Sequence, residues 1–424
     1  MNEYRIAGGR RLQGEVRVQG AKNSALPILA ACTVCRGVNV IHNCPQLTDI
    51  EATINILRHL GCKVSVDANT VTVDSTSVET CHVPDYLMQE MRSSVIFLGA
   101  VAARMGKASL SLPGGCEIGL RPIDLHLDAL RKLGARITEE GGHIYLACPA
   151  RLQGTVISLS FPSVGATENV LISASTAKGT TTLVNAAREP EISDLADFLN
   201  RCGARISGAG EGIITIEGVS SLHAAEHCVI PDRIVAASYM IAAAVTHGDV
   251  TLQNCIPAHI DPVTSLLQDA GCDIIVKEKQ LRVIAGEKLR AVPTVRTMPY
   301  PGFPTDAQAL MMTAACIANG TSIFIETIFE SRFRHVPELC RFGADILVDG
   351  RIAVVKGVSC LQAACVSAPD LRGGAALVLA GLAAQGETVV RELQHIDRGY
   401  EAFEMQLSRL GADIRRTENE KTSG

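Results

Sequence analysis

One cysteine stands apart from the others by its neighbours. Cys116 follows Pro113-Gly114-Gly115 and comes five residues before Arg121. The glycines and prolines predict an exposed loop, and a nearby guanidinium favours the reactive thiolate form of a thiol. Most of the other cysteines lie in apolar runs, where a thiol is a small buried hydrophobe. Cys116 is therefore a candidate catalytic thiol, and a structural filler is the alternative.

A second candidate is an aspartate at a predicted helix start. Asp306 follows Phe303-Pro304-Thr305 and precedes an apolar, Ala-containing run. A carboxylate at this place either stabilises the helix as an N-cap or first-turn residue, or serves as a general base at a helix end that lines a cleft. The pattern alone favours the stabilising role.

Basic residues recur at equivalent positions in the chain, at predicted helix openings and in the loops between them. They are Lys22, Arg92, Arg121, Arg332, Arg372 and Arg398. Each alone is typical of a solvated surface charge, but their recurrence predicts that they converge. Several cations, guanidiniums above all, suit a small ligand that carries both a phosphate and a carboxylate.

Two series of glycines reveal the elements that must position these residues. The first series is Gly61, Gly134, Gly203, Gly271, Gly343 and Gly411, and the second is Gly37, Gly106, Gly179, Gly248, Gly320 and Gly386. A glycine in the left-handed conformation commonly ends a helix, so each series predicts six helix ends before strands. The chain thus contains six repeats of roughly 70 residues, each with the order strand, helix, strand, helix, strand pair.

Six repeats in a chain of 424 residues predict two α/β domains with three repeats each. We expect residues 21–229 to form one domain, and residues 230–424 the other, completed by a strand within residues 1–20. The first helix of each repeat is apolar on all sides and so should be buried. If these helices share a direction, their positive N-terminal ends would attract anions to a cleft.

Composition excludes several classes of protein. The net charge is −5, whereas nucleic-acid binders are usually basic. No long uncharged apolar run and no signal-peptide pattern occur, so we expect a cytoplasmic protein without membrane spans. The fifteen cysteines include one Cys-x-x-C, Cys32 to Cys35, without a second pair at zinc-site spacing. We therefore expect no metal.

The same motifs give the chain a family resemblance from end to end. They are residues 20–27, 91–94, 112–126, 163–167, 185–192, 303–306, 332–338 and 395–401. In these segments the chain resembles the UDP-N-acetylglucosamine 1-carboxyvinyltransferases, which move the enolpyruvyl group of phosphoenolpyruvate to a UDP-sugar. The Pro-Gly-Gly-Cys loop is specific to that family. The sister enzyme, 5-enolpyruvylshikimate-3-phosphate synthase, shares the sixfold fold, the two-domain inside-out α/β barrel, but lacks the cysteine loop.

The resemblance implies a role for each candidate. Cys116 would give a proton to the enolpyruvyl carbon, and Asp306 would take the proton of the sugar 3-hydroxyl, with Lys22 and Arg398 also catalytic. The residues implied for phosphoenolpyruvate are Lys22, Asn23, Arg121, Arg332, Arg372 and Arg398. Those implied for UDP-N-acetylglucosamine are Asn23, Arg92, Arg121, Pro122, Ile123, Asp124, Leu125, Ser163, Val164, Asp306 and Ile328.

The implied reaction is addition followed by elimination of phosphate, the first committed step of peptidoglycan precursor synthesis. It requires no metal or organic cofactor and no obligate protein partner, and fosfomycin would inactivate the enzyme at Cys116. Two departures concern substrate affinity: Val235-Ala236-Ala237-Ser238 replaces an acidic residue followed by Ala-Gly-Thr, and Phe161 stands where some members have a basic residue. Two alternatives remain open, namely transfer to shikimate 3-phosphate and a non-catalytic regulatory paralogue that binds UDP-sugar.

Overall fold

The computed structural model describes residues 2–90, 92–111 and 123–418. The chain divides into two compact units. The described part of the N-terminal unit comprises residues 20–90, 92–111 and 123–230, and that of the C-terminal unit comprises residues 2–19 and 231–418. Within these residues, none of the helices is long and apolar enough to cross a membrane.

One repeat of the N-terminal unit shows the plan that the others share. Its elements are β11 (Val156–Ser158), α6 (Val164–Ala174), β12 (Thr180–Val184), α7 (Pro190–Arg201), β13 (Arg205–Ser207) and β14 (Ile213–Glu217). β11 is parallel to β12, while β14 pairs antiparallel with both β12 and β13. The sheet order is therefore β11-β12-β14-β13. This is the succession of elements that the glycine spacing predicts.

The other two four-stranded sheets described in the N-terminal unit follow the same plan. One contains β7 (His82–Val83), β8 (Lys107–Ser111), β10 (His143–Ala147) and β9 (Arg136–Glu140), with α3 (Asp85–Glu90), η1 (Arg92–Val95), α4 (Ile96–Met105) and α5 (Asp124–Lys132). The other contains β16 (Glu226–Cys228), β4 (Val38–His42), β6 (Thr70–Asp74) and β5 (Lys63–Asp67), with α1 (Lys22–Ala31) and α2 (Thr48–His59). A short pair joins β3 (Cys35–Arg36) to β15 (Leu222–His223).

The C-terminal unit has three described sheets of this type. The first contains β2 (Gln13–Arg17), β17 (Asp249–Gln253), β19 (Gln280–Ala285) and β18 (Cys272–Lys277), with α8 (Arg233–Val245), η2 (Pro257–His259) and α9 (Asp261–Asp269). The second contains β20 (Thr294–Arg296), β21 (Thr321–Ile325), β23 (Ile352–Lys356) and β22 (Asp345–Asp349), with α10 (Thr305–Cys316) and α11 (Val336–Arg341). The third contains β24 (Cys365–Ser367), β25 (Glu387–Arg391), β1 (Asn2–Ala7) and β26 (Asp413–Glu418), with α12 (Leu371–Ala383), η3 (Leu393–His395) and α13 (Phe403–Arg409).

The N-terminal segment differs from the single strand expected around residues 3–18. It forms two strands in different sheets, because β1 lies between β25 and β26 whereas β2 is parallel to β17. The break is at Gly8, where a Cβ atom would overlap the carbonyl oxygen of Ala384. The backbone can pass the end of α12 this closely only without a side chain, and there it leaves the first sheet.

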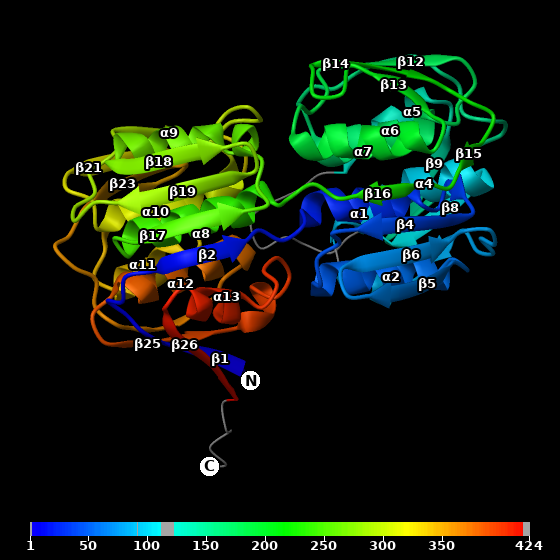
Figure 1. Ribbon diagram of the computed structural model, residues 1–424. Helices are drawn as coiled ribbons and strands as arrows, with labels where there is room; N and C mark the ends of the chain where they lie inside the picture. The colour runs from blue at the N-terminus through cyan, green and yellow to red at the C-terminus, as the bar shows by residue number, and fades with distance from the viewer. Residues whose placement is uncertain (1, 91, 112–122, 419–424) are drawn as a thin grey trace. The chain divides into compact units, whose positions relative to one another are not determined.

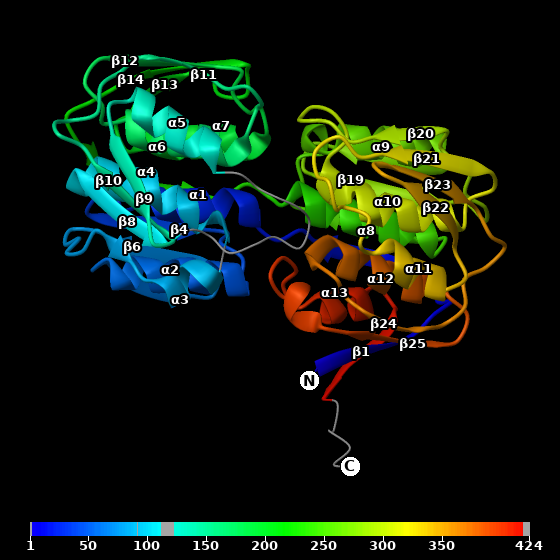
Figure 2. The ribbon, with the colours of Figure 1, turned by 180° about the vertical axis from the view of Figure 1, so that it is seen from behind.

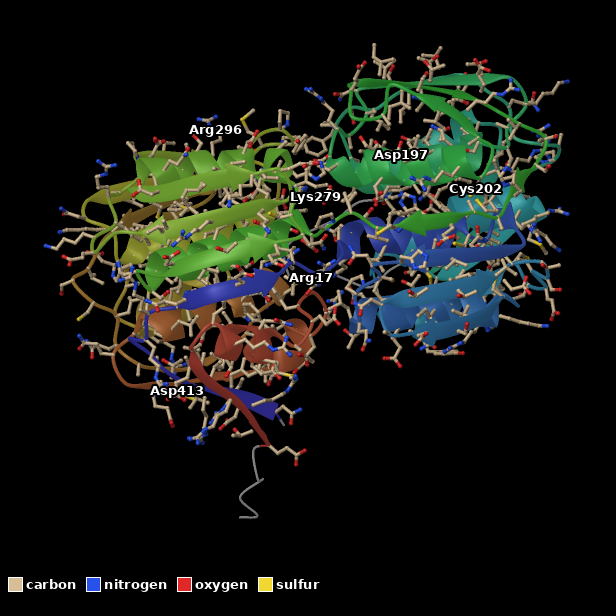
Figure 3. All side chains as sticks on the ribbon, viewed as in Figure 1. Arg17, Asp197, Cys202, Lys279, Arg296 and Asp413 are labelled. Carbon is tan, nitrogen blue, oxygen red and sulfur yellow. The ribbon has the colours of Figure 1, made fainter. Side chains whose placement is uncertain are left out.

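Apolar helices form the centre of each unit, and the sheets lie around them (Figure 1 and, from behind, Figure 2). In the C-terminal unit the central helices are α8, α10 and α12, and all residues of α10 from Ala307 to Cys316 are buried. The sheets turn one face to these helices and the other outward, so Val250 and Leu252 of β17 are buried. Exposed charges such as Arg17 of β2 and Arg296 of β20 are labelled in Figure 3. These features confirm the predicted fold class.

The first glycine series marks helix ends as predicted, but in the second series Gly37, Gly179, Gly320 and Gly386 lie three to six residues beyond the preceding helix. All six glycines of the first series have φ between 85° and 103°, and each lies two residues after a helix. In the second series Gly248 is not in the left-handed region, and His247, with φ 53°, makes the left-handed turn instead. A Cβ atom on Gly248 would lie 2.5 Å from the carbonyl oxygen of Leu12, so glycine is required there for close approach of the chain that enters β2.

Candidate active site

The sequence-predicted site residues differ in how far the structure describes them. Cys116, Arg121 and Pro122 lie outside the described residues. For Arg92 only the backbone is described, as the first residue of η1. The remaining candidates are distributed over both units.

In the C-terminal unit, Asp306 pairs with two arginines. It lies in the first turn of α10, one of the two helix-stabilising positions that the sequence pattern favoured, and the N-cap residue is Pro304. Its Oδ1 accepts a hydrogen bond from Arg332 Nη2 at 2.9 Å, and its Oδ2 accepts one from Arg372 Nη2 at 3.2 Å. Both arginine side chains are 4% exposed, whereas the Asp306 side chain is 27% exposed. Asp306 thus reaches solvent between two buried guanidiniums.

Arg372 carries a hydrogen-bond donor that no described residue satisfies. The side chain of Asp370 caps α12 by accepting from the backbone N–H groups of Arg372 and Gly373, both at 3.0 Å. The Nη1 atom of Arg372 is buried and has no hydrogen-bond partner among the described residues. Burial lowers the pKa of Arg372, but Asp306, Tyr400 and Asp232 outweigh it, so the pKa is raised. An unsatisfied buried donor on a fixed cation favours an anionic ligand.

Tyr400 supports Arg372 from the neighbouring loop. The Arg372 Cζ atom lies 5.6 Å from the centre of the Tyr400 ring, and the Tyr400 hydroxyl is 2.8 Å from Ser238 Oγ. Ser238 belongs to the segment that departs from the family pattern, and its hydroxyl also donates to the carbonyl of Ile234. Val235 is fully buried, and Asp232 caps the start of α8. This helix end therefore keeps a complete cap without the acidic residue of the family.

Gln19 holds the loop that contains Arg398. Its Nε2 donates to the carbonyl of Gly399 at 3.2 Å, and its Oε1 accepts from the backbone N–H of Glu401 at 2.8 Å. Arg398 itself is half-buried and immediately precedes Gly399, the first of the two residues that Gln19 binds. The Gln19 side chain therefore restrains the loop that contains Arg398. In the sequence, Gln19 also precedes the second candidate cation, Lys22, by three residues.

In the N-terminal unit, Lys22 is the first residue of α1 and is buried. Its Nζ lies 2.6 Å from Asp49 Oδ2, which is in the first turn of α2. Asn23 follows and is half-buried. Ser24 donates to Asp194, whose other carboxylate oxygen is 2.8 Å from His227 Nε2. The start of α1 is thereby fixed to α2, α7 and the strand β16.

The residues predicted to bind the UDP-sugar lie at the starts of two other helices in this unit. Asp124 begins α5 after the N-cap residue Ile123, and Leu125 follows it. Ser163 caps α6, accepting from Ala166 N at 3.3 Å, and Val164 is the first residue of the helix. A Cβ atom on Gly165 would lie 2.9 Å from the His126 ring, so these two helix starts are close together.

His126 is held between the two helices as a neutral ring. Burial lowers its pKa to about 4. Its Nδ1 is 2.7 Å from Asn169 Nδ2, and Asn169 Oδ1 accepts from Gly99 N at 3.0 Å. Because the amide nitrogen donates, Nδ1 of His126 accepts and its proton is on Nε2. The segment of residues 123–125 is thus tied to the centre of the unit.

Three buried glutamates lie close together near the start of α6. Glu168 is on α6, and Glu189 and Glu191 are at the start of α7. Burial, assisted by the charges of Glu191 and Glu189, raises the pKa of Glu168 to about 8. Glu168 is therefore largely protonated at neutral pH. Glu189 and Glu191 belong to the motif of residues 185–192, which predicts no role for their side chains.

Sequence reasoning missed the residues that hold the candidates in place. They are Gln19, Asp49, His126, Asn169, Asp194, His227, Glu326 and Tyr400. His126 and Tyr400 lie inside motifs already quoted, so their position was a usable signal. Asp49 and Asp194 lie on helices whose pattern shows only an ordinary amphipathic face, and nothing in that pattern reveals their partners.

Comparisons with known proteins agree with the motifs. Residues 6–407 match the family model of EPSP synthase (3-phosphoshikimate 1-carboxyvinyltransferase). The chain is 51% identical to UDP-N-acetylglucosamine 1-carboxyvinyltransferase 2 of Caldanaerobacter subterraneus subsp. tengcongensis, over 98% of this chain and 99% of the relative. It is 49% identical to UDP-N-acetylglucosamine 1-carboxyvinyltransferase of Solidesulfovibrio magneticus, over 98% of this chain and 100% of the relative.

Solved structures give the same result. The enolpyruvyl transferase NikO of Streptomyces tendae superposes with a TM-score of 0.89 at 28% identity, covering 99% of both chains. An EPSP synthase of Acinetobacter baumannii superposes with a TM-score of 0.76 at 18% identity, covering 99% of this chain and 100% of that chain, and shows the shared fold alone. The chain therefore belongs to the EPSP synthase family of enolpyruvyl transferases, and within it to the UDP-N-acetylglucosamine 1-carboxyvinyltransferases.

Proposed function

We propose that this protein transfers the enolpyruvyl group of phosphoenolpyruvate to the 3-hydroxyl of UDP-N-acetylglucosamine and releases phosphate. The observation that carries the proposal is the pairing of Asp306 with Arg332 and Arg372, where a partly exposed carboxylate lies between two buried guanidiniums. The names of the curated relatives, at about half identity over nearly the whole chain, support the choice of substrates.

In the proposed reaction, the two arginines bind the carboxylate of phosphoenolpyruvate, and the unsatisfied Nη1 of Arg372 supplies one donor. Lys22, Arg121 and Arg398 bind its phosphate, with Asn23 beside them. Fixed cations of this kind stabilise the negative charge of the substrate throughout the reaction without reorganising.

Addition comes first. Cys116 gives its proton to the methylene carbon of phosphoenolpyruvate, which makes the neighbouring carbon electrophilic. The 3-hydroxyl oxygen of the sugar bonds to that carbon while Asp306 accepts the hydroxyl proton. Elimination follows, when the Cys116 thiolate takes a proton back from the methyl group, the double bond forms again, the carbon–oxygen bond to phosphate breaks and the proton held by Asp306 passes to the departing phosphate. The products are the enolpyruvyl ether and inorganic phosphate.

The UDP-sugar is proposed to bind at the helix starts that carry Ile123 to Leu125 and Ser163 to Val164, together with Asn23, Arg92, Arg121, Pro122, Asp306 and Ile328. The N-terminal end of α6 is suited to a diphosphate because backbone N–H groups point outward there. We place the reaction in the cytoplasm, at the start of peptidoglycan precursor synthesis, without a resident metal, an organic cofactor or an obligate protein partner.

The decisive experiment measures phosphate release from phosphoenolpyruvate with each acceptor. We expect release with UDP-N-acetylglucosamine and none above background with shikimate 3-phosphate. The reverse preference would support the first alternative. Binding of the UDP-sugar without release of phosphate would support the non-catalytic paralogue.

The role of Cys116 is tested by Cys116→Ser, which removes the acidic thiol with little change of volume. We expect turnover to be abolished while calorimetry still detects binding of UDP-N-acetylglucosamine. Fosfomycin should add covalently to the wild type and not to this variant, as measured by intact mass. Substantial turnover by the serine variant, or label on another residue, would contradict the assignment. Cys228→Ser, at an exposed cysteine of β16, is the matched control.

A further inference from the structure

A buried carboxylate next to Asp306 joins three segments of the C-terminal unit. Glu326 follows β21 and is 1% exposed. Its Oε1 accepts from Thr297 Oγ1 at 2.9 Å and from the backbone N–H groups of Ile328 at 2.8 Å and Phe329 at 3.0 Å. Its Oε2 accepts from Thr305 Oγ1 at 2.9 Å. One side chain therefore fixes the end of β20, the start of α10 and the loop after β21.

The bond to Thr305 connects this carboxylate to the candidate base. Thr305 is the first residue of α10 and Asp306 is the second. The N-cap residue of α10, Pro304, makes no side-chain cap hydrogen bond. The hydrogen bond from the Thr305 hydroxyl therefore links the first turn of α10, which includes the backbone of Asp306, to the buried carboxylate of Glu326.

The loop after β21 returns to the same helix start. Arg332, at its end, donates from Nε and Nη2 to the carbonyl of Thr305 at 3.3 and 3.2 Å, and from Nη2 to Asp306. Glu326 thus accepts from the backbone of Ile328, the same loop continues to Arg332, and Arg332 donates to the carbonyl of Thr305. The Thr305 hydroxyl in turn donates to Glu326, so these contacts form a ring. A closed set of hydrogen bonds restrains both the orientation of the carboxylate and the guanidinium that pairs with it.

We propose that Glu326, acting through the hydroxyl of Thr305, is a positioning residue for Asp306 in the proton transfer of the proposed function. Glu326 is too deeply buried to meet a substrate, so its effect is on geometry. Proton transfer requires donor and acceptor atoms within hydrogen-bond distance, and small displacements of a base reduce the rate of the chemical step strongly. This inference rests on the proposed function, because it assigns Asp306 as the base.

The test compares two threonines that donate to the same carboxylate. Thr305→Val removes only the bond between Glu326 and α10. Thr297→Val removes the other hydroxyl that donates to Glu326, and the same hydroxyl accepts from the backbone N–H of Thr327. This variant therefore loses more hydrogen bonds than Thr305→Val, but none of them involves α10. Thr305→Ser keeps the hydroxyl and is the rescue variant.

We expect Thr305→Val to lower kcat at least tenfold, with KM for both substrates changed less than threefold. Thr297→Val should lower kcat less than threefold although its melting temperature falls as much or more. Thr305→Ser should recover most of the wild-type kcat. If the valine variant does not fold, Thr305→Ala, which removes the hydroxyl without adding a methyl group, takes its place.

Equal losses of kcat in the two valine variants, in step with their melting temperatures, would mean that Glu326 only stabilises the fold and would overturn this inference alone. A Thr305→Val variant with wild-type kcat would do the same. A wild type that releases no phosphate from the two substrates would instead overturn the proposed function, and the assignment of Asp306 with it.

Discussion

Asp306 illustrates a conflict between two roles of one carboxylate. As the proposed base it must accept a proton, yet it pairs with Arg332 and Arg372, the guanidiniums proposed to bind the carboxylate of phosphoenolpyruvate. Two anions then compete for the same donors. A substrate carboxylate that takes over these donors would leave Asp306 less tightly paired and so a better proton acceptor.

This competition gives a prediction for Asp306→Asn. Turnover should fall by about 10²- to 10⁴-fold, the usual contribution of a general base. Binding of phosphoenolpyruvate should be as tight as in the wild type or tighter, because the neutral amide competes less for the two arginines. Calorimetric titration and phosphate release measure the two effects separately. Binding weakened tenfold or more would contradict the argument, and Asp349→Asn, at an exposed carboxylate of β22, is the control.

At the scale of elements, the contact between α4 and α6 depends on a glycine. Gly99 of α4 packs directly on Asn169 of α6, and its backbone N–H donates to Asn169 Oδ1. A Cβ atom at this position would overlap that oxygen. The same asparagine binds His126 and the carbonyl of Val95, so α4, α5 and α6 meet at one side chain.

We therefore expect Gly99→Ala to destabilise the N-terminal unit, although alanine is the better helix former. Overpacking a core in this way typically costs about 1–3 kcal/mol. Urea unfolding of the variant should show a lower midpoint with an unchanged slope. Gly212→Ala is the matched control, since a Cβ atom there meets no atom within 4 Å. A midpoint equal to that of the control would show that α4 and α6 shift apart enough to accommodate the methyl group without loss of stability.

The elements themselves were largely predictable, because glycine spacing and apolar helices depend on local backbone chemistry. The departures from prediction arise where distant chain segments meet. Gly248 is required by the approach of Leu12, and the break between β1 and β2 is required by Ala384. No local pattern contains either partner.

The candidate site divides in the same way. The sequence identified Asp306, Arg332 and Arg372 as candidates, and both arginine side chains lie within hydrogen-bond distance of Asp306. The sequence did not indicate that Asp49 pairs with Lys22 or that Gln19 binds the loop of Arg398. Both contacts join segments that are far apart in the sequence. The roles of the candidates rest on the family resemblance.

For the molecule as a whole, buried titrating groups set the dependence of stability on pH. Glu168 has its pKa raised from 4.5 to about 8 by burial. The folded state then holds this proton more tightly than the unfolded state, so the stabilisation is complete below pH 4.5 and is lost as the pH rises through 8. His126 and His335, both with pKa values lowered by burial to about 4, act in the opposite sense, and their contribution is lost as the pH falls from 6.5 towards 4.

Glu168→Gln isolates the first of these effects. The amide has nearly the same shape and cannot ionise, so the variant should gain stability over the wild type as the pH rises from 5 to 8. Denaturant unfolding at the two pH values measures the difference, and Glu211→Gln, at an exposed glutamate, controls for the change of net charge. A difference independent of pH would show that Glu168 has an ordinary pKa.

The pairing of β1 has a consequence for biosynthesis. β1 lies between β25 and β26, and β2 lies beside β17, so residues 2–17 leave the ribosome more than 200 residues before the strands that pair with them. The described residues of the N-terminal unit all lie between residues 20 and 230, so this unit can assemble during translation while the strands ahead of it stay unpaired. A chain that ends after residue 230 and has been released from the ribosome should therefore protect residues 20–90, 92–111 and 123–230 from protease and leave residues 2–17 open to cleavage.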